Sequence, residues 1–387
     1  MPVKKVLYIS TASNISGATL ALLEIIDEIR KRGMEAAVVT AERGELEKRL
    51  RERGVRIYRA RYASWLCREG ELDTLTGKAK YSLKKLLESY SEGVVTRALK
   101  RERPDIVHIN TGMSPVGLKS AHRFGIPVVW HLRELPYICW KRLPYDADYE
   151  LRCLREADRL IAISDYVEAQ FRGKSADNLV RLYDGVDTDA YSDVRRTPIL
   201  SEPVMKLSLC GGYEEKGHKD AILAAKSLVS RGFETFHLSF WGSFIPQYRS
   251  ELEKLIHSCG LEKWITFEGQ TSEMPKKWGE TDIALVCSTG EAFGRVTVEA
   301  MAAGALVIGA DAGATPELLA ENRGLLYRQG DPEDLADKIS YAAENADSSA
   351  KIAEAGKKYV LSGAFSMKKN IDGLLSIYTA IQGKRNK

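Results

Sequence analysis

Residues 288–304 read STGEAFGRVTVEAMAAG and follow a short apolar run that is typical of a buried strand. The pattern after Gly294 predicts a helix that begins there. In an open parallel sheet, ligands bind at the carboxyl ends of the strands, where helix N-termini present unpaired N–H groups and a positive dipole end. The stretch therefore predicts an anion site that suits a diphosphate. We expect the amides of Gly294, Arg295 and Val296 to donate to it, because glycine lets the backbone approach closely.

Two glutamates bracket this anion site, Glu291 in the loop and Glu299 just over one turn into the helix. Carboxylates accept pairs of hydroxyl hydrogen bonds, so one would hold a ribose diol and the other the hydroxyls of a transferred sugar. The alternative for Glu299 is an exposed i, i+4 partner of Arg295. Arg295 favours the first interpretation, because a cation at a helix N-terminus opposes the dipole and is easier to explain beside a bound phosphate.

Short apolar runs and helical patterns alternate on both sides of this stretch, which is typical of α/β proteins with parallel sheets covered on both faces. The polar stretch 191–203 separates two such series. We therefore expect two doubly wound domains, residues 1–195 and 196–365, and a C-terminal helix in 366–387 that packs across the domain junction. Strands are expected near Lys5–Ile9, Ala36–Thr40, Val55–Tyr58, Ile106–Asn110, Val128–Leu132, Leu160–Ser164, Leu179–Tyr183, Lys206–Cys210, His237–Gly242, Ile265–Gly269, Ile283–Ser288 and Leu306–Ala310.

Length and composition agree with two packed domains. The 387 residues are 44% apolar and 28% charged, which excludes a disordered or fibrous chain. The six cysteines are scattered without metal-ligand spacing, so we expect reduced thiols. The apolar run within residues 1–10 is too short for the apolar region of a signal peptide or for a membrane span, and we expect a cytoplasmic protein. The net charge of +4 is mild, and no nucleic-acid motif accompanies it, so nucleic acid is not an expected partner.

The segment 78–103 differs in character, because basic residues surround Leu83, Leu87, Tyr90 and Val94 on one helical face. Such a helix can touch an anionic membrane from the cytoplasmic side. The alternative, a surface helix packed on its own domain with solvated lysines, is favoured.

Taken together, these motifs resemble the retaining glycosyltransferases of the GT-B fold, glycosyltransferase family 4, whose pattern is E-x-F-G-x-x-x-x-E-A-M-A-x-G. The resemblance covers nearly the whole chain and implies two Rossmann-like domains that face each other across a cleft, with the acceptor bound by the N-terminal domain and the nucleotide sugar by the C-terminal one. Further matches, in order, are Ser16-Gly17, Pro104-Asp105-Ile-Val-His108, Gly125-Ile-Pro-Val-Val-Trp-His131, Tyr183-Asp184-Gly185-Val186-Asp187, Lys216-Gly217 and Pro316-Glu317-Leu318 after the Gly313 turn.

The resemblance also implies roles for matching positions. Lys216 would contact the donor diphosphate, Glu299 the ribose and Glu291 the transferred sugar, while Gly17 would reach the phosphates from the first domain. His131 would contact the donor sugar or the acceptor near the reacting carbon. The residues implied in catalysis are therefore His131, Glu291 and Lys216, and those implied in donor binding are Gly17, Lys216, Glu291, Phe293, Gly294, Arg295, Val296 and Glu299.

Two departures from the family pattern stand out. Many relatives carry an arginine a few residues before the lysine, but residues 210–216 read CGGYEEK, with no cation before Lys216. The diphosphate would then depend on Arg295 or on a residue of the first domain. The usual Asn-Gly turn is Asp184-Gly185, which keeps the turn chemistry but changes the group that Asn would supply.

Two Asp-x-Asp triplets, Asp146-Ala-Asp148 and Asp187-Thr-Asp189, invite a metal-dependent interpretation. Aspartates before a helix and in a turn are also common caps, and this alternative is favoured. In the family that the chain resembles, lysine and helix amides stabilise the leaving phosphate, so we expect no metal and no other cofactor.

The implied reaction is transfer of a hexose-type sugar, with retention, from a UDP- or GDP-sugar to a glycan, lipid-linked or small-molecule acceptor in cell-surface polysaccharide or glycoconjugate synthesis. The aromatic and basic regions Tyr62–Trp65 and Pro136–Tyr145 are candidate acceptor surfaces. Two alternatives stay open: a non-hydrolysing nucleotide-sugar epimerase and a non-catalytic nucleotide-sugar-binding protein. A nicotinamide dehydrogenase is disfavoured, because neither domain begins with a G-x-G-x-x-G turn.

Overall fold

The computed structural model describes residues 3–62, 64–139, 141–195 and 197–385. Its contacts divide the chain into two units, Met1–Gly185 with Met367–Lys387, and Val186–Ser366. The division falls between Gly185 and Val186, ten residues before the position that the sequence predicts, and it groups the C-terminal tail with the first unit. Arg196, the first residue of the predicted second domain, lies outside the described residues.

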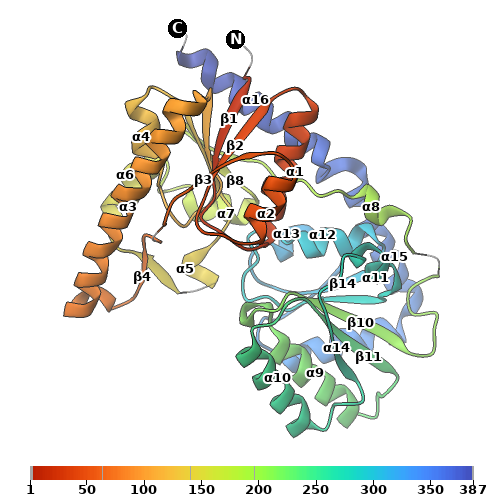
Figure 1. The fold of residues 1–387 in the computed structure, drawn as a ribbon. Coiled ribbons are helices and arrows are strands. Elements are labelled where there is room, and N and C mark those ends of the chain that lie inside the picture. The colour runs from red at the N-terminus through yellow and green to blue at the C-terminus, as the bar shows by residue number, and fades with distance from the viewer. Residues whose placement is uncertain (1–2, 63, 140, 196, 386–387) are drawn as a thin grey trace. The chain divides into compact units, whose positions relative to one another are not determined.

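The first unit is built on a seven-stranded sheet with the order β3-β2-β1-β5-β6-β8-β9, in which all neighbours are parallel (Figure 1). Strands β4 and β7 do not belong to this sheet, so its seven strands follow the doubly wound order 3-2-1-4-5-6-7 when they are numbered among themselves. The direction of winding reverses between β1 and β5. The strands are β1 (Lys5–Ile9), β2 (Glu35–Thr40), β3 (Arg56–Arg59), β5 (Ile106–Ile109), β6 (Val128–Leu132), β8 (Arg159–Ala162) and β9 (Leu179–Arg181).

Helix α1 (Gly17–Lys31) begins where Ser16 and Thr19 form a reciprocal capping box, and its apolar side is buried on the sheet. Helix α16 (Met367–Arg385) lies beside α1 although it is more than 330 residues away in sequence (Figure 1). Its apolar residues complete the core of the first unit, namely Ile371, Leu374, Tyr378 and Ile381. The last helix of the chain is therefore an integral layer of the first unit.

A small antiparallel ribbon of β4 (Leu66–Arg68) and β7 (Arg142–Pro144) stands apart from the main sheet. The first unit's remaining helices are α2 (Glu45–Glu52), η1 (Glu71–Asp73), α3 (Leu75–Glu102), α4 (Leu118–Arg123), α5 (Pro136–Cys139), α6 (Ala147–Glu156) and α7 (Asp165–Phe171).

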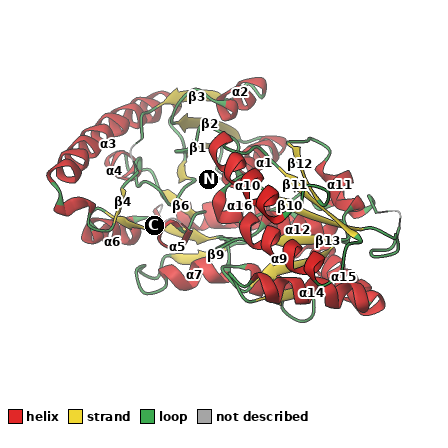
Figure 2. Ribbon diagram, turned by 90° about the horizontal axis from the view of Figure 1, so that it is seen from below, coloured by secondary structure: helices red, strands yellow, loops and turns green. Residues whose placement is uncertain are grey.

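The second unit repeats the doubly wound design with a six-stranded parallel sheet in the order β12-β11-β10-β13-β14-β15, and its switch point lies between β10 and β13. Figure 2 shows α9 and α14 beside its strands, and these two helices pack against each other. Its strands are β10 (Met205–Cys210), β11 (Phe236–Trp241), β12 (Ile265–Gly269), β13 (Ile283–Val286), β14 (Leu306–Ala310) and β15 (Leu325–Tyr327). Its helices are α8 (Asp189–Ser192), η2 (Glu214–Lys216), α9 (His218–Ser230), α10 (Pro246–Cys259), α11 (Met274–Glu280), α12 (Arg295–Ala302), α13 (Thr315–Leu319), α14 (Pro332–Glu344), α15 (Ala346–Tyr359) and the single π-type turn η3 (Val360–Ala364).

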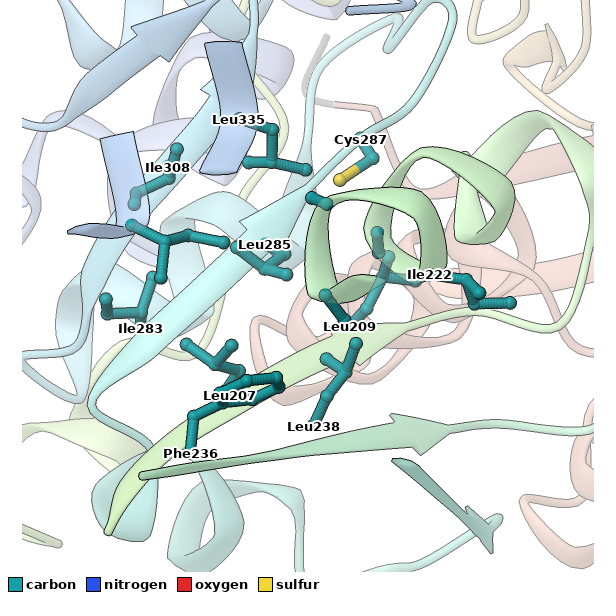
Figure 3. Packing of buried hydrophobic residues seen from close by; sticks show 14 of the residues in the cluster. Leu207, Leu209, Ile222, Phe236, Leu238, Ile283, Leu285, Cys287, Ile308 and Leu335 are labelled. Atoms are coloured by element: carbon teal, nitrogen blue, oxygen red, sulfur yellow. The ribbon is translucent and has the colours of Figure 1, made fainter. Parts of the chain in front are cut away.

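The core of the second unit lies between this sheet and its helices. Leu209 of β10 and Leu285 of β13 pack together with Ile222 of α9 (Figure 3). The central strands β13 and β14 are buried at every position because helices cover both faces of a parallel sheet.

All twelve strands expected from the sequence are present, each within two residues of its expected bounds. Strands β4, β7 and β15 are not expected from the sequence, because each has only three residues and so short a run shows no periodicity. Among the described residues, no helix is both long enough and apolar enough to cross a bilayer. The described cysteine side chains, Cys67, Cys153, Cys210, Cys259 and Cys287, form no disulfide.

Candidate functional site

Lys216 and Glu291 come together at the switch point of the second sheet. Lys216 ends the turn after β10, and Glu291 lies in the loop after β13, so both follow the carboxyl ends of neighbouring strands. A backbone hydrogen bond from the Thr289 amide to the Glu215 carbonyl (3.0 Å) ties the two loops together. This is the place where doubly wound sheets bind ligands.

The two side chains form an ion pair, with Lys216 Nζ 2.5 Å from Glu291 Oε1. Ser288 Oγ donates to the same oxygen over 2.6 Å. Burial alone would raise the pKa of Glu291, but the Lys216 charge and the two hydrogen bonds outweigh it and hold that pKa below its ordinary value. Lys216 is 27% exposed and Glu291 15%, so a ligand can still reach the ionised pair.

Glycines hold Lys216 in place by allowing close backbone contacts. Gly211 adopts φ 110°, and a Cβ there would come within 2.9 Å of the Lys216 side-chain stem. Gly217 adopts φ 75°, and a Cβ there would come within 2.0 Å of the Cys287 carbonyl oxygen. Any larger residue would push these loops apart.

Gly313 fixes the Glu291 loop from the other side. This glycine lies after β14 with φ 62°, and a Cβ would fall 2.4 Å from the Glu291 nitrogen and 2.5 Å from its carbonyl oxygen. The next residue, Ala314, donates its amide to the Glu291 carbonyl over 2.8 Å. Glu291 is thus positioned by three loops, those that follow β10, β13 and β14.

Helix α12 begins at Arg295 with Gly294 as its N-cap residue, at φ 98°. The sequence therefore predicts correctly where this helix starts. Arg295 and Glu299 form the expected i, i+4 pair at 4.0 Å, but the alternative of an exposed pair is wrong, since the two side chains are only 11% and 15% exposed. Such partial burial suits side chains that line a site.

The remaining donor-binding candidates occupy different environments. Val296 is half-buried in the first turn of α12, and Phe293 is buried and packs edge-to-face on Phe365 with ring centroids 5.5 Å apart. Gly17 is exposed as the first residue of α1, after β1 of the first unit. The structure thus gathers the lysine, the glutamates and the helix start in the second unit and places Gly17 in the first.

His131 lies near the carboxyl end of β6 in the first unit and is fully buried. Its Nδ1 is 3.2 Å from His108 Nε2 and 3.3 Å from Arg133 Nη2. Burial, together with the Arg133 charge and His108, lowers the pKa of His131 well below 6.5. His131 is therefore a neutral imidazole at physiological pH.

Several residues that build the site are not predicted from the sequence. Ser288 and Gly313 stand within quoted motifs, yet nothing in their spacing says that they contact Glu291. Arg133 carries no sequence signal, although its Nη1 lies 2.5 and 2.6 Å from the two carboxylate oxygens of Asp184, the residue that replaces the usual Asn. Only the tertiary fold reveals a buried arginine next to an unusual turn residue.

The two aspartate triplets lie at the starts of two different helices, α6 and α8. Asp146 caps α6 by accepting from the Tyr149 amide over 2.8 Å, and Asp189 lies in the first turn of α8. Within the described ranges, no group of three His, Cys, Asp or Glu side chains is arranged to hold a metal ion.

The two candidate acceptor regions, far apart in sequence, lie side by side. Strand β4 pairs with β7, and the Tyr145 amide donates to the Trp65 carbonyl over 2.8 Å. The Tyr145 ring stacks on Tyr81 of α3 with centroids 5.0 Å apart. Ala63 and Trp140, which belong to these regions, lie outside the described residues.

Both units match known protein families. Residues 207–359 match the model described as Glycosyl transferases group 1, and residues 16–182 match the model described as Glycosyl transferase 4-like domain. The chain is 28% identical over 240 residues to the GDP-mannose-dependent alpha-(1-6)-phosphatidylinositol monomannoside mannosyltransferase of Mycobacterium tuberculosis. This match covers 57% of this chain and 62% of that protein. It is 27% identical over 270 residues to the sulfoquinovosyl transferase SQD2 of Arabidopsis thaliana, covering 62% of this chain and 50% of that protein. The match thus spans about three fifths and one half of these relatives.

Solved structures resemble the whole chain. HepE from Anabaena in complex with UDP and glucose has a TM-score of 0.77 at 22% identity and covers 97% of this chain and 100% of its own. A glycosyltransferase from Rickettsia africae has a TM-score of 0.80 at 20% identity and covers 98% of each chain. At these identities the likeness shows a shared fold. With a family model on each unit and the GT-B fold over 97% of its length, the chain belongs to the group 1 glycosyl transferases, family 4 of the GT-B glycosyltransferases.

Proposed function

We propose that the protein is a retaining glycosyltransferase that moves a hexose-type sugar from a UDP- or GDP-sugar to a glycan, lipid-linked or small-molecule acceptor in cell-surface polysaccharide or glycoconjugate synthesis. The observation that supports this best is the half-buried Lys216–Glu291 pair at the switch point of the second sheet. The relatives include GDP-mannose-dependent mannosyltransferases, which agrees with a nucleotide-sugar donor.

The donor would be held by groups that complement each part of it. Lys216 and the first amides of α12 would face the diphosphate, because a cation and a helix start both favour negative charge. Glu299 would accept the ribose hydroxyls and Glu291 those of the transferred sugar. When the donor binds, Lys216 would exchange part of its pairing with Glu291 for the diphosphate.

The same groups would act in the transfer step. As the bond between the sugar and the phosphate breaks, Lys216 would stabilise the charge that grows on the leaving phosphate. The acceptor oxygen would enter from the leaving-group face, which retains the anomeric configuration, and the phosphate would take its proton. A lysine and helix amides supply the charge stabilisation, so we propose that neither a metal nor another cofactor takes part.

A panel of UDP-, GDP-, ADP- and dTDP-sugars titrated by calorimetry tests the donor site. We expect one donor class to bind, and Glu299→Ala to weaken it by about 10- to 100-fold, the worth of a hydrogen bond to a charged group. Glu280→Ala is the matched control, since Glu280 also pairs with a neighbouring cation on a helix of the second unit. Equal effects of the two substitutions would contradict the donor site.

The reaction itself is tested by NMR of the product. We expect the new glycosidic bond to keep the donor's anomeric configuration. Conversion of the nucleotide sugar without an acceptor would favour the epimerase, and binding without any turnover would favour the non-catalytic protein.

We further propose that the protein works in the cytoplasm and touches the inner face of the membrane through the first half of α3. Leu75 and Leu86 there are 86% and 68% exposed, and with Leu83 and Tyr90 they lie within an arc of about 80° on the helix. The sequence predicts one face with Leu83, Leu87, Tyr90 and Val94, and this prediction is wrong for the second half of the helix. Val94 is buried there with Ser91, Val95, Ala98 and Leu99, and Leu87 is half-buried.

Positive charge surrounds this apolar stripe. Lys78, Lys80 and Lys85 are exposed beside it. At its end, Tyr90 borders a groove of about 640 Å³ that four arginines line, namely Arg51, Arg59, Arg97 and Arg101. An apolar stripe flanked by cations is complementary to an anionic lipid surface.

Co-sedimentation with vesicles tests this contact. We expect binding to phosphatidylglycerol vesicles and little to phosphatidylcholine vesicles, and the double change Leu83→Ser and Leu86→Ser should abolish it. Leu361→Ser, at an exposed leucine of the second unit, is the control. Undiminished binding of the double variant would contradict the proposal.

A further inference from the structure

A chain of buried polar side chains crosses the first unit from α16 to β6. The Tyr378 hydroxyl of α16 lies 3.3 Å from the Tyr8 hydroxyl of β1 and 2.5 Å from Nδ1 of His108 in β5. His108 Nε2 in turn lies 3.2 Å from Nδ1 of His131 in β6. The four side chains are buried.

Arg133 sets the direction of these hydrogen bonds. A guanidinium has only donors, and Arg133 Nη2 lies 3.3 Å from His131 Nδ1. That nitrogen must therefore accept. Because a neutral imidazole carries one N–H, the proton of His131 is on Nε2.

The remaining bonds follow in turn. Since His131 Nδ1 accepts, His108 donates from Nε2, which leaves His108 Nδ1 as an acceptor for the Tyr378 hydroxyl. The Tyr378 oxygen can then accept from the Tyr8 hydroxyl. Each nitrogen and hydroxyl of this network is thereby assigned as a donor or an acceptor. In the alternative tautomer, the His131 Nδ1–H would face the N–H groups of Arg133 and His108, so donors would meet donors.

Asp184 keeps Arg133 in place. The carboxylate of Asp184 accepts from Nη1, and the Asn110 side-chain oxygen accepts from Arg133 Nε over 2.7 Å. Arg133 and Asp184 are 1% and 4% exposed, so the guanidinium has no alternative partner in water. The Asp that replaces the usual Asn in this turn therefore supplies the charge that a buried arginine requires.

His131 Nε2 is buried and has no hydrogen-bond partner among the described residues. A buried N–H without a partner is costly, and such groups are kept where they serve a function. We propose that Arg133, His108 and Tyr378 are positioning residues that fix His131 as a neutral imidazole with its proton on Nε2, so that it gives a hydrogen bond to a sugar oxygen and does not accept the acceptor's proton. This inference rests on the proposed transferase function.

The tautomer can be read directly, without substrate, from long-range ¹H–¹⁵N spectra of the full-length protein. We expect His131 to show a protonated Nε2 and an unprotonated Nδ1 throughout pH 6 to 8. His131→Asn, which removes its signals, identifies them among the six histidines. A proton on Nδ1, or a cationic ring at pH 7, would overturn the inference.

Two variants then test the role of His131 in turnover. His131→Gln keeps an amide donor near the place of Nε2, whereas His131→Asn keeps only an acceptor near Nδ1. We expect the Gln variant to retain about tenfold more turnover than the Asn variant, the worth of one hydrogen bond. Equal losses in both, with the tautomer as inferred, would overturn the donor role.

The double change Arg133→Met and Asp184→Leu removes the ion pair without leaving a lone charge. We expect a second tautomer of His131 to appear and turnover to fall by about tenfold, with little change in the KM for the donor. An unchanged tautomer and full turnover would overturn the positioning role. The proposed function can fail separately from this inference. If no donor sugar supports transfer by the wild type, the transferase function is contradicted, while a proton observed on His131 Nε2 still confirms the inferred tautomer.

Discussion

Arg133–Asp184 in the first unit and Lys216–Glu291 in the second are ion pairs at the carboxyl ends of their sheets, and the two pairs differ in burial and support. Arg133–Asp184 of the first unit is 1% and 4% exposed and is surrounded by side-chain partners. Lys216–Glu291 of the second unit is 27% and 15% exposed and is held by backbone at glycines.

The difference in burial suggests that the first pair serves stability and the second serves ligand binding. A fully buried pair cannot exchange partners, so it holds neighbouring groups in fixed positions. Removing one member leaves the other as a buried charge that water cannot solvate. A pair that water can reach contributes little to stability and can exchange partners for a ligand. We therefore expect changes in the first pair to act on folding and changes in the second to act on turnover.

The largest expected effect is the loss of stability on breaking the buried pair. Arg133→Met should lower the free energy of unfolding by about 3–5 kcal/mol, because Asp184 would be left as an uncompensated buried charge. Adding Asp184→Leu should restore most of this loss. Urea titration followed by tryptophan fluorescence measures both changes. Lys216→Met is the comparison, with an expected loss below about 1 kcal/mol, and similar losses in the two single variants would erase the contrast.

The next effect concerns turnover. Lys216→Met should lower kcat by about 10²- to 10³-fold, because it removes charge stabilisation of the leaving phosphate, worth about 2.7–4 kcal/mol in comparable sites. Release of the nucleoside diphosphate measures this. Lys219→Met serves as control, since Lys219 pairs with Glu214 at an exposed position of α9, a few residues along the chain. A comparable loss in the control would show that general charge, and not the pair, matters.

Substitution of Gly313 should have a smaller effect on donor affinity. The added methyl group of Gly313→Ala would overlap the backbone of Glu291, so the loop must shift, and we expect donor affinity to fall by about tenfold (about 1.4 kcal/mol). Gly260→Ala is matched in backbone conformation, with φ 67° against 62°, but its Cβ would meet nothing within 4 Å. Calorimetric titration of both variants separates the contact with Glu291 from the strain of a positive φ.

The sequence predicts the second site better than the first. Gly294, Glu291 and Glu299 stand in one stretch, and the strand-to-helix pattern alone places them at the end of a parallel strand. The doubly wound sheets follow from the same alternation of apolar runs. These features could be predicted because they depend on neighbours in sequence.

The network around His131 could not be predicted in this way. Its members come from β1, β5, β6, α16 and the turn at Asp184, which only the tertiary fold brings together. No periodicity marks a buried arginine, and the tail helix gives no sign that Tyr378 contacts a histidine 270 residues earlier. The replacement of Asn by Asp was visible in the sequence, but its meaning depends on Arg133.

The smallest expected effect is a pH dependence of stability, to which His108 and His131 of the first unit contribute beside the buried His218 of the second unit. Burial and the Arg133 charge lower the pKa of both His108 and His131 well below 6.5, so the unfolded chain binds protons that the folded protein does not. Their contribution to stability is therefore complete above pH 6.5 and is lost as the pH falls below it, by about 0.8 kcal/mol for each histidine at pH 6. Burial raises the pKa of Glu134 to about 7 and lowers that of His218, so these groups also change stability between pH 8 and pH 6. Urea titrations at both pH values therefore isolate His131 only as a difference, and His131→Asn should lose about 0.8 kcal/mol less than the wild type over this interval. Equal losses in the two proteins would mean that His131 is charged in the folded state, and the contrast between a neutral, locked first site and a charged, exchangeable second site would not hold.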